Sequence, residues 1–210
     1  MSKPLPTLLR THFSALRMLL VMTVILGVAY PLLVTGISQA AFGQKANGSI
    51  VKTADGKEIG SSLLGQNYDL PKQNPDDENE QARPDPKWFQ PRPSANKYDG
   101  KVSGASNQGP NSEDLTKTIE DRRAAVAAFD GVDPASVPVD ALTASGSSLD
   151  PHISVAYAEE QVHRIAKERN LPVDTVNRLV EKYTEGRSLG FLGQEGVNVV
   201  LLNTALAEQK

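Results

Sequence analysis

The sequence contains no cysteine, and this absence excludes several kinds of site at once. Without a thiol the chain cannot form a disulfide framework, a zinc ribbon, a cysteine-held cluster or a thiol nucleophile. An excess of positive charge is also missing, because the formal net charge is -3 and the isoelectric point is near 5.7. We therefore expect no nucleic-acid partner, since such partners require a basic surface.

Sequence motifs for nucleotide hydrolysis and for ion conduction are missing as well. A P-loop requires two glycines with four residues between them, then Lys and Ser or Thr. Gly104 and Gly109 have this spacing, but Pro110 and Asn111 follow them. The Asp-Lys-Thr-Gly-Thr pattern of phosphoenzyme pumps and the Thr-Val-Gly-Tyr-Gly filter of potassium channels do not occur. The chain is expected neither to hydrolyse ATP by a known motif nor to form a pore.

A long uncharged run lies near the N-terminus of this 210-residue chain. Residues 18–37 read MLLVMTVILGVAYPLLVTGI, and the uncharged stretch continues through Gln44. This length spans a bilayer, whereas the apolar region of a cleaved signal is about 7–15 residues long. Residues 38–40 (SQA) resemble a cleavage site and keep the signal alternative open, but we favour a retained anchor with a kink at Pro31.

The charges that flank this run predict its orientation. Lys3, Arg10 and Arg17 precede the run and no acid accompanies them, so the positive-inside rule keeps the N-terminus in the cytoplasm. The predicted parts are a short basic cytoplasmic tail (1–17), a single transmembrane helix (18–42) and an exported soluble domain (43–210).

The segment after the run mixes strand and helix signals, so we predict a mixed α/β domain of the α+β class. Residues 48–66 alternate around the turn Asp55-Gly56, which predicts a hairpin. Residues 70–87 form an acidic, proline-rich loop that is expected to be mobile. Residues 88–110 are rich in Gly, Pro and Ser but contain aromatic side chains, which is typical of a structured loop.

Helical periodicity dominates the second half of the chain. Ser112 is expected to cap a helix that ends at Asp130-Gly131, and Ser154 is expected to cap a second one. A third helix is predicted from Pro172 to Gly186. The last apolar run, residues 197–206, fits a strand, a helix, or a strand that passes into a helix. On the second helix, the side chains expected to face water are Glu159, Glu160, Arg164, Lys167 and Glu168.

A cluster of serines with a histidine invites a catalytic interpretation. A hydrolase would use a serine of the 145–148 turn (Ser145, Ser147 or Ser148) as nucleophile and His152 as its base, but no G-x-S-x-G elbow is present. We favour a plain loop in which Asp150 bonds backbone amides ahead of Pro151. His152 and His163 have no third ligand at metal-site spacing, so no metal site is predicted.

Two loops contain candidate interface residues. In residues 90–94 (QPRPS) the prolines stiffen the backbone and Arg92 can bind a carboxylate, while Trp88 and Phe89 could serve either the core or an interface. Phe191 and Leu192 lie between glycines, and we expect them to fold back onto the core rather than form an exposed apolar tip.

The sequence resembles the C-subunit family of the bacterial high-affinity potassium-transporting Kdp ATPase over nearly its whole length. The matching segments are YPLLVTG (30–36), ANGSIV (46–51), GSSLLGQ (60–66), FQPRPSA (89–95), SGASNQGP (103–110), VPVDALTASGSSLDPHIS (137–154) and GRSLGFLGQEGVNVVLLNTAL (186–206). Departures are small: the acidic loop is longer, and Val155 and His163 stand where the family often has proline.

The resemblance implies a noncatalytic accessory subunit of a four-part pump in the bacterial inner membrane. Its partners would be a channel-like potassium-conducting subunit, a P-type subunit that hydrolyses ATP with Mg²⁺, and a small stabilising subunit. The family is also described as a catalytic chaperone that raises ATP affinity through a glutamine, for which Gln194 and Gln161 are the candidates. The predicted topology places both glutamines on the outer side, away from ATP. We therefore expect a structural role on the outer face of the channel-like subunit.

That structural role includes an expected influence on potassium uptake. The exported domain is acidic, and the acids Asp76, Asp77, Glu78 and Glu80 lie in its predicted mobile loop. Such a cluster raises the local cation concentration within a Debye length of about 8 Å.

Overall fold

In the computed structural model the chain divides into two compact units.

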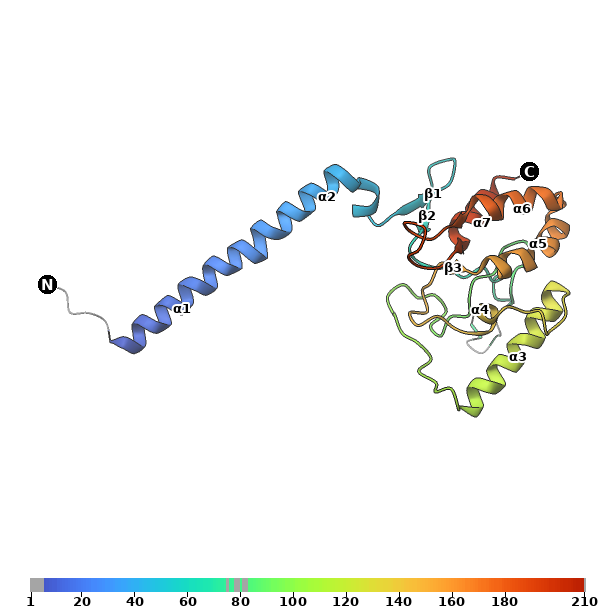
Figure 1. The fold of residues 1–210 in the computed structure, drawn as a ribbon, viewed down its shortest axis with the longest axis horizontal. Helices are drawn as coiled ribbons and strands as arrows, with labels where there is room; N and C mark the ends of the chain where they lie inside the picture. The colour runs from blue at the N-terminus through green and yellow to red at the C-terminus, as the bar shows by residue number, and fades with distance from the viewer. Residues whose placement is uncertain (1–5, 75, 78–79, 81–82, 210) are drawn as a thin grey trace. The chain divides into compact units, whose positions relative to one another are not determined.

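 The described residues are 6–74, 76–77, 80 and 83–209. The first unit ends at Ser49 and the second begins at Ile50 (Figure 1). Glu78, one of the acids named above, lies outside the described residues.

The first unit is one helical rod of 40 residues, Thr7–Ala46. It consists of α1 (Thr7–Val24), a π-helical turn η1 (Ile25–Ala29) and α2 (Tyr30–Ala46). The π turn ends two residues before Pro31. Pro31 has no amide hydrogen to donate to the carbonyl of Gly27, four residues earlier, and the widened turn accommodates that missing bond. Phe42 leaves helical geometry (φ -138°, ψ 40°), so a second irregularity follows near the end of α2.

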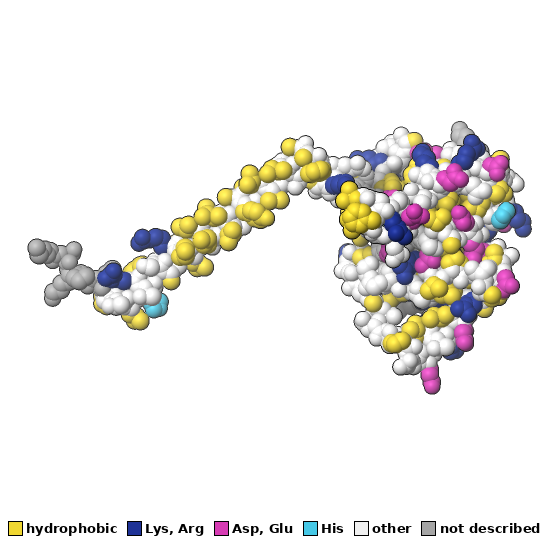
Figure 2. Space-filling view, viewed as in Figure 1, with side chains coloured by type: hydrophobic (Ala, Val, Ile, Leu, Met, Phe, Trp, Pro, Cys, Tyr) yellow, Lys and Arg dark blue, Asp and Glu magenta, His cyan; other side chains and the backbone are white. Residues whose placement is uncertain are grey.

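The rod is long and apolar enough to cross a membrane, and none of its most apolar stretch is buried by the chain itself. Hydrophobic side chains cover its middle, and basic side chains lie toward its ends (Figure 2). At 1.5 Å per residue the rod is about 60 Å long, whereas a hydrocarbon core is about 30 Å thick. The predicted span, residues 18–42, therefore lies inside a helix that continues on both sides of it. Its membrane boundaries stay a prediction.

The second unit begins with the predicted hairpin. Strand β1 (Ile50–Lys52) pairs antiparallel with β2 (Glu58–Ser61), and Gly56 adopts a left-handed conformation (φ 83°) in the connecting turn. Gly60 is required for a different reason: a Cβ there would collide with the Gln66 side-chain amide, which donates to the Ile59 carbonyl. The hairpin prediction is confirmed.

Helix α3 (Glu113–Asp130) follows the long loops and has the predicted ends. The Ser112 hydroxyl accepts a hydrogen bond from the Leu115 amide, and Glu113 and Asp114 favour the positive end of the helix dipole. Gly131 closes the helix in the left-handed conformation (φ 73°). A short helix α4 (Val139–Leu142) then buries Ala141 and Leu142.

The remaining elements enclose the core. They are β3 (His152–Ile153), α5 (Val155–Arg169), α6 (Val173–Lys182), β4 (Thr184–Glu185), β5 (Gly196–Asn198) and α7 (Val199–Ala207). The strands form an antiparallel sheet in the order β3-β5-β4. The run 197–206 is a strand that passes into a helix, because the Asn198 side chain accepts from the Leu201 amide and caps α7.

One face of α5 packs into the core, where Ala158, Val162, Ile165 and Ala166 are buried. Two details of the helix predictions are wrong. Helix α6 ends at Lys182 rather than near Gly186, because β4 begins at Thr184. Arg164, which was expected to face water, is buried with only 7% of its surface exposed.

The acidic loop runs along the surface of this unit. Its described residues form no helix or multi-residue strand, but Asp69 pairs with Pro84 in an isolated antiparallel bridge. The two ends of the loop are thereby held together. Its mobility stays a prediction.

Candidate functional site

A segment of the 88–110 loop is held in the core by two side-chain amides. The Phe89 amide donates to Asn203 Oδ1 (3.0 Å), and Asn203 Nδ2 donates to the Phe89 carbonyl (3.0 Å). Gln161 does the same for Gln90, with its Oε1 accepting from the amide (2.6 Å) and its Nε2 donating to the carbonyl (3.1 Å). Because both backbone groups of each residue are paired, this loop can be buried without an unsatisfied polar group.

Arg164 is the centre of the same network. Its guanidinium forms an ion pair with Asp130 (2.6 Å), donates to Gln161 Oε1 (2.7 Å) and to the Trp88 carbonyl (3.1 Å), and lies 4.4 Å above the Phe129 ring. Burial of an arginine is tolerated when its donors are paired in this way. The arginine connects α5, the end of α3 and the 86–90 segment.

The sequence could have indicated this buried row of polar side chains. Tyr157, Gln161 and Arg164 follow one another at i, i+4 and i+7, which places them on one stripe of α5 beside the apolar face. The hydrogen-bond partners could not have been found in the same way, since Asn203 and Asp130 lie far away in the chain.

These contacts decide the positions of the three candidates Trp88, Phe89 and Gln161. Phe89 is fully buried in the core, and Gln161 has both its amide nitrogen and its carbonyl oxygen engaged within the domain. Trp88 is half-buried and has the Arg169 guanidinium over its ring at 4.8 Å. All three support the domain's own packing.

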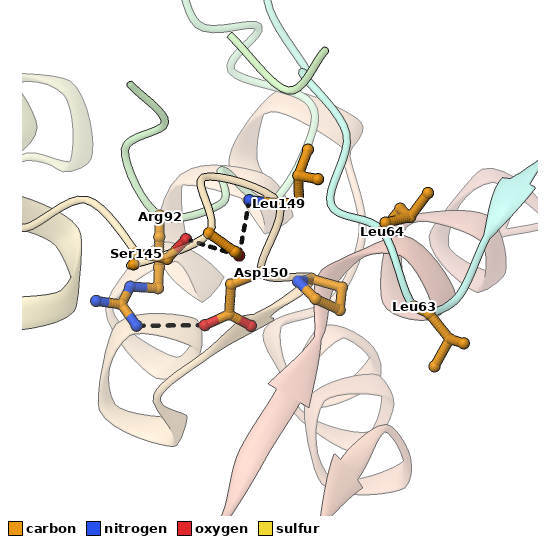
Figure 3. A pocket seen from close by; sticks show the side chains of 9 residues that line it. Leu63, Leu64, Arg92, Ser145, Leu149 and Asp150 are labelled. Atoms are coloured by element: carbon orange, nitrogen blue, oxygen red, sulfur yellow. Dashed lines mark hydrogen bonds and ion pairs between the residues drawn. The ribbon is translucent and has the colours of Figure 1, made fainter. Parts of the chain in front are cut away.

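Arg92 begins a chain of charged side chains. Its guanidinium points at the Asp150 carboxylate (3.3 Å, Figure 3), and the other Asp150 oxygen lies 3.6 Å from His152 Nδ1. On the far side of the ring, His152 Nε2 lies 3.4 Å from Glu185. His152 reaches Glu185 across the central strand at Gly196, where a Cβ would make only ordinary van der Waals contact with His152 Cβ (3.5 Å).

The surroundings of His152 and Asp150 favour the charged form of each of these two side chains. The hydrogen bond to Asp150 raises the pKa of His152, and Glu185 adds to the effect against a smaller cost of burial. Burial by itself would raise the pKa of Asp150, but the bonds from His152 and the charge of Arg92 outweigh it and lower that pKa. Asp150 also accepts from the His152 amide (3.0 Å), which fits the predicted loop ahead of Pro151.

The serines of the 145–148 turn form no nucleophile–base pair. Ser148 donates to the Gly104 carbonyl (2.6 Å) and accepts from the Ala95 amide (3.0 Å), so it ties two loops together. Ser147 accepts from the Leu149 amide, and Ser145 lies 3.4 Å from Ser147. Both ring nitrogens of His152 face carboxylates, so the geometry gives the hydrolase alternative no support.

Two hollows lie beside these loops. The one in Figure 3, of about 460 Å³, has Arg92, Ser145 and Asp150 on one side and Leu63 and Leu64 on the other. A second hollow, of about 670 Å³, is lined in part by Arg92, Lys97, Arg122, Phe129 and Tyr157. Burial lowers the pKa of Arg122 there. Within the described part of the chain, no group of three His, Asp or Glu side chains could hold a metal ion.

Among the described residues of the second unit, the loop between β4 and β5 holds the most exposed large apolar side chain. Leu189, Phe191 and Leu192 are 84%, 70% and 50% exposed. The expectation that Phe191 and Leu192 fold onto the core is therefore wrong. The reason is geometric: Ser188 pairs with Leu192 in an antiparallel bridge that turns the loop back on itself, away from the core. Gln194 is exposed beside this turn.

The comparisons with known proteins agree with this architecture. The family model described as "K+-transporting ATPase, c chain" matches residues 12–208. A Streptomyces avermitilis protein described as a potassium-transporting ATPase KdpC subunit is 49% identical, with 95% of this chain and 94% of that protein covered. Proteins of the same description from Kineococcus radiotolerans and Sorangium cellulosum are each 48% identical, over 98% and 91% of this chain and over 97% and 94% of their own lengths.

These relationships cover both units of the chain: the long apolar N-terminal helix and the mixed helix and sheet domain that follows it. The chain belongs to the KdpC family, and it is a noncatalytic, membrane-anchored subunit of a K+-transporting Kdp ATPase.

Proposed function

We propose that the chain serves assembly of the pump: the domain after the anchor lies on the outer side of the membrane, docks on the channel-like subunit and stabilises the complex. The observation that carries this proposal is how the domain uses its polar side chains. Gln161, Arg164 and His152, which could have served chemistry, are each engaged in holding the domain's own loops. A domain whose polar side chains are occupied in this way is suited to binding a partner rather than to catalysis.

Charge supports the proposed orientation. Arg10 and Arg17 are the described charges before the apolar run, and all 25 acids of the chain lie in residues 50–210. The positive-inside rule then keeps the N-terminus in the cytoplasm and exports the domain. An acidic domain on the outer side would also favour cations near the site of uptake.

The catalytic-chaperone hypothesis requires the domain to lie on the cytoplasmic side, because ATP and the hydrolysing domain are cytoplasmic. Gln161 would have to release two backbone groups of Gln90 before it could contact a nucleotide. Gln194 is exposed and needs no such rearrangement, so the hypothesis depends on the side of the membrane at which Gln194 lies.

Cysteine labelling determines on which side of the membrane Gln194 lies. Gln194→Cys introduces the single thiol of an otherwise cysteine-free chain, and a membrane-impermeant maleimide is applied to intact cells that produce the whole complex. We expect labelling without lysis. Protection that ends only on lysis would contradict the proposed topology. Arg10→Cys, in the segment before the apolar run, is the matched control and is expected to be protected until lysis.

Assembly needs a separate experiment. The full chain and a chain truncated after Ser49 are each produced with the other three subunits, and the complex is purified through a tag on the channel-like subunit. We expect the truncated chain to reduce recovery of the intact complex and to lower its melting temperature. Equal recovery and equal melting would show that the anchor alone provides assembly, and would overturn the proposed role of the domain.

A further inference from the structure

The β4–β5 loop ends in a compact apolar turn, here called the apolar tip (residues 188–192). Seven consecutive residues, 188–194 (SLGFLGQ), carry no charge, and Arg187 and Glu195 stand at the two ends. Leu189, Phe191 and Leu192 expose most or half of their surfaces. Exposed apolar side chains grouped at one loop mark an interaction surface.

Three backbone amides of the tip donate hydrogen bonds within the loop. The Gly190 amide donates to the Arg187 carbonyl (3.0 Å), and the amides of Phe191 and Leu192 both donate to the Ser188 carbonyl (3.3 and 2.9 Å). A loop whose amides are paired internally loses little when it leaves water, whereas unpaired amides make apolar surroundings costly.

The conformation that presents the side chains is itself unusual. Leu189 has a positive φ (55°), and Gly190 and Gly193 also have positive φ values (82° and 86°). Left-handed backbone is common for glycine but uncommon for leucine. The turn thus holds an apolar side chain outward at a conformational cost, which is the kind of strain that occurs at functional positions.

The length of the connecting chain limits how far the domain can lie from its anchor. The anchor helix ends at Ala46 and β1 begins at Ile50, so the link between them spans at most about 14 Å. Within the second unit, Ile50 pairs with Ser61, and the next residue, Ser62, accepts a hydrogen bond at its carbonyl from Asn198 at the end of β5 (2.8 Å). Figure 1 shows β1 and β2 beside the start of α7.

We propose that the apolar tip is a second membrane contact, which inserts Leu189, Phe191 and Leu192 into the interfacial region of the bilayer that holds the anchor. An apolar surface of this kind inserts about 5–10 Å, to the boundary between headgroups and acyl chains. Arg187 and Glu195 then stay at the level of the headgroups. The contact restricts the domain's rotation about its short link, and it goes beyond the proposed function because it involves lipid rather than another subunit.

The test uses the full-length chain alone, in phosphatidylcholine and phosphatidylglycerol vesicles. Ser188→Cys carries an environment-sensitive fluorophore, and lipids with a nitroxide near the headgroup act as quenchers. We expect about twofold more quenching at this position than at two exposed controls. Asp55→Cys lies in the hairpin turn, close to the anchor along the chain, and Val139→Cys replaces a valine that is 73% exposed.

A second variant separates insertion from mere proximity. In the Ser188→Cys background, Leu189→Ser with Phe191→Ser should reduce quenching to the level of the controls, and an unchanged melting temperature would show that the domain still folds. Quenching that persists in this variant would overturn the proposal. So would the absence of quenching in the chain alone, including the case in which the fluorophore becomes shielded only when the other subunits are added, because the tip would then bind protein.

Discussion

Phe89 and Phe191 lie in similar stretches of sequence and meet opposite environments. Each stands in a loop rich in glycine or proline, with polar residues nearby. Phe89 has no exposed surface, whereas Phe191 is 70% exposed. The difference lies in the partners of the backbone: Asn203 pairs both backbone groups of Phe89, while the Phe191 amide is paired inside its own turn.

The comparison teaches that side-chain amides decide which loop can be buried. A loop cannot enter a core unless its backbone groups find partners there. Asn203 on α7 and Gln161 on α5 supply those partners for the 89–90 segment. For the apolar tip no such amide from α5 or α7 is present among the described contacts, so its apolar side chains stay outside and are available for binding.

The largest effect is expected at the centre of the network. Arg164→Met leaves the Asp130 carboxylate buried without its ion pair, and losing one partner of such a pair costs about 3–5 kcal/mol. Chemical denaturation of the purified chain measures the loss. Arg178→Met, at an exposed position on α6, is the control and should cost far less. A small loss in Arg164→Met would show that the 86–90 segment is held by other contacts.

A loss of the same order is expected when one side-chain amide is removed. Asn203→Leu keeps the side-chain size but leaves the amide and the carbonyl of Phe89 unpaired, at about 1–3 kcal/mol for each group. The same denaturation experiment measures this loss. Asn170, at the exposed end of α5, cannot provide the control, because its left-handed backbone would add a separate cost to a leucine there. Asn67→Leu in a loop serves instead. Equal stability of Asn203→Leu and the wild type would contradict the comparison.

The pH dependence tests the ion pairs at the base of the apolar tip. The folded state raises the pKa of His152 through Asp150 and Glu185, so the stabilisation is fully present below the unfolded pKa of about 6.5. It is lost as the pH rises through the folded pKa. The difference in unfolding free energy between the wild type and His152→Gln should therefore be larger at about pH 5 than at about pH 9. A difference that is constant with pH would exclude this contribution.

The smallest effect on stability is expected at the tip itself. Phe191→Ala should change the free energy of unfolding by no more than about 0.5 kcal/mol, as is usual for exposed positions. The matched change in the core, Phe89→Ala, should cost about 3–5 kcal/mol. Thermal and chemical unfolding of the two variants measure the contrast directly. Similar losses in both would show that Phe191 packs on the domain in solution.

The sequence by itself determined the anchor, the hairpin and the helices. Each depends on local features: an uncharged run longer than a bilayer is thick, the Asp55-Gly56 turn, and the serine caps at Ser112 and Ser154. Local features act between residues close in the chain, so a reader of the sequence can find them. The order of short matching segments also sufficed to indicate the family, which the comparisons confirmed.

Only the tertiary structure decided which polar and aromatic side chains are buried. Arg164 looked like a water-facing residue and Phe191 like a core residue, and both expectations were reversed. The reason is that burial depends on partners far apart in the chain: Asp130 for Arg164, and Asn203 for Phe89, 114 residues away. Residue type and spacing do not reveal those partners, because the fold alone brings them within hydrogen-bond distance.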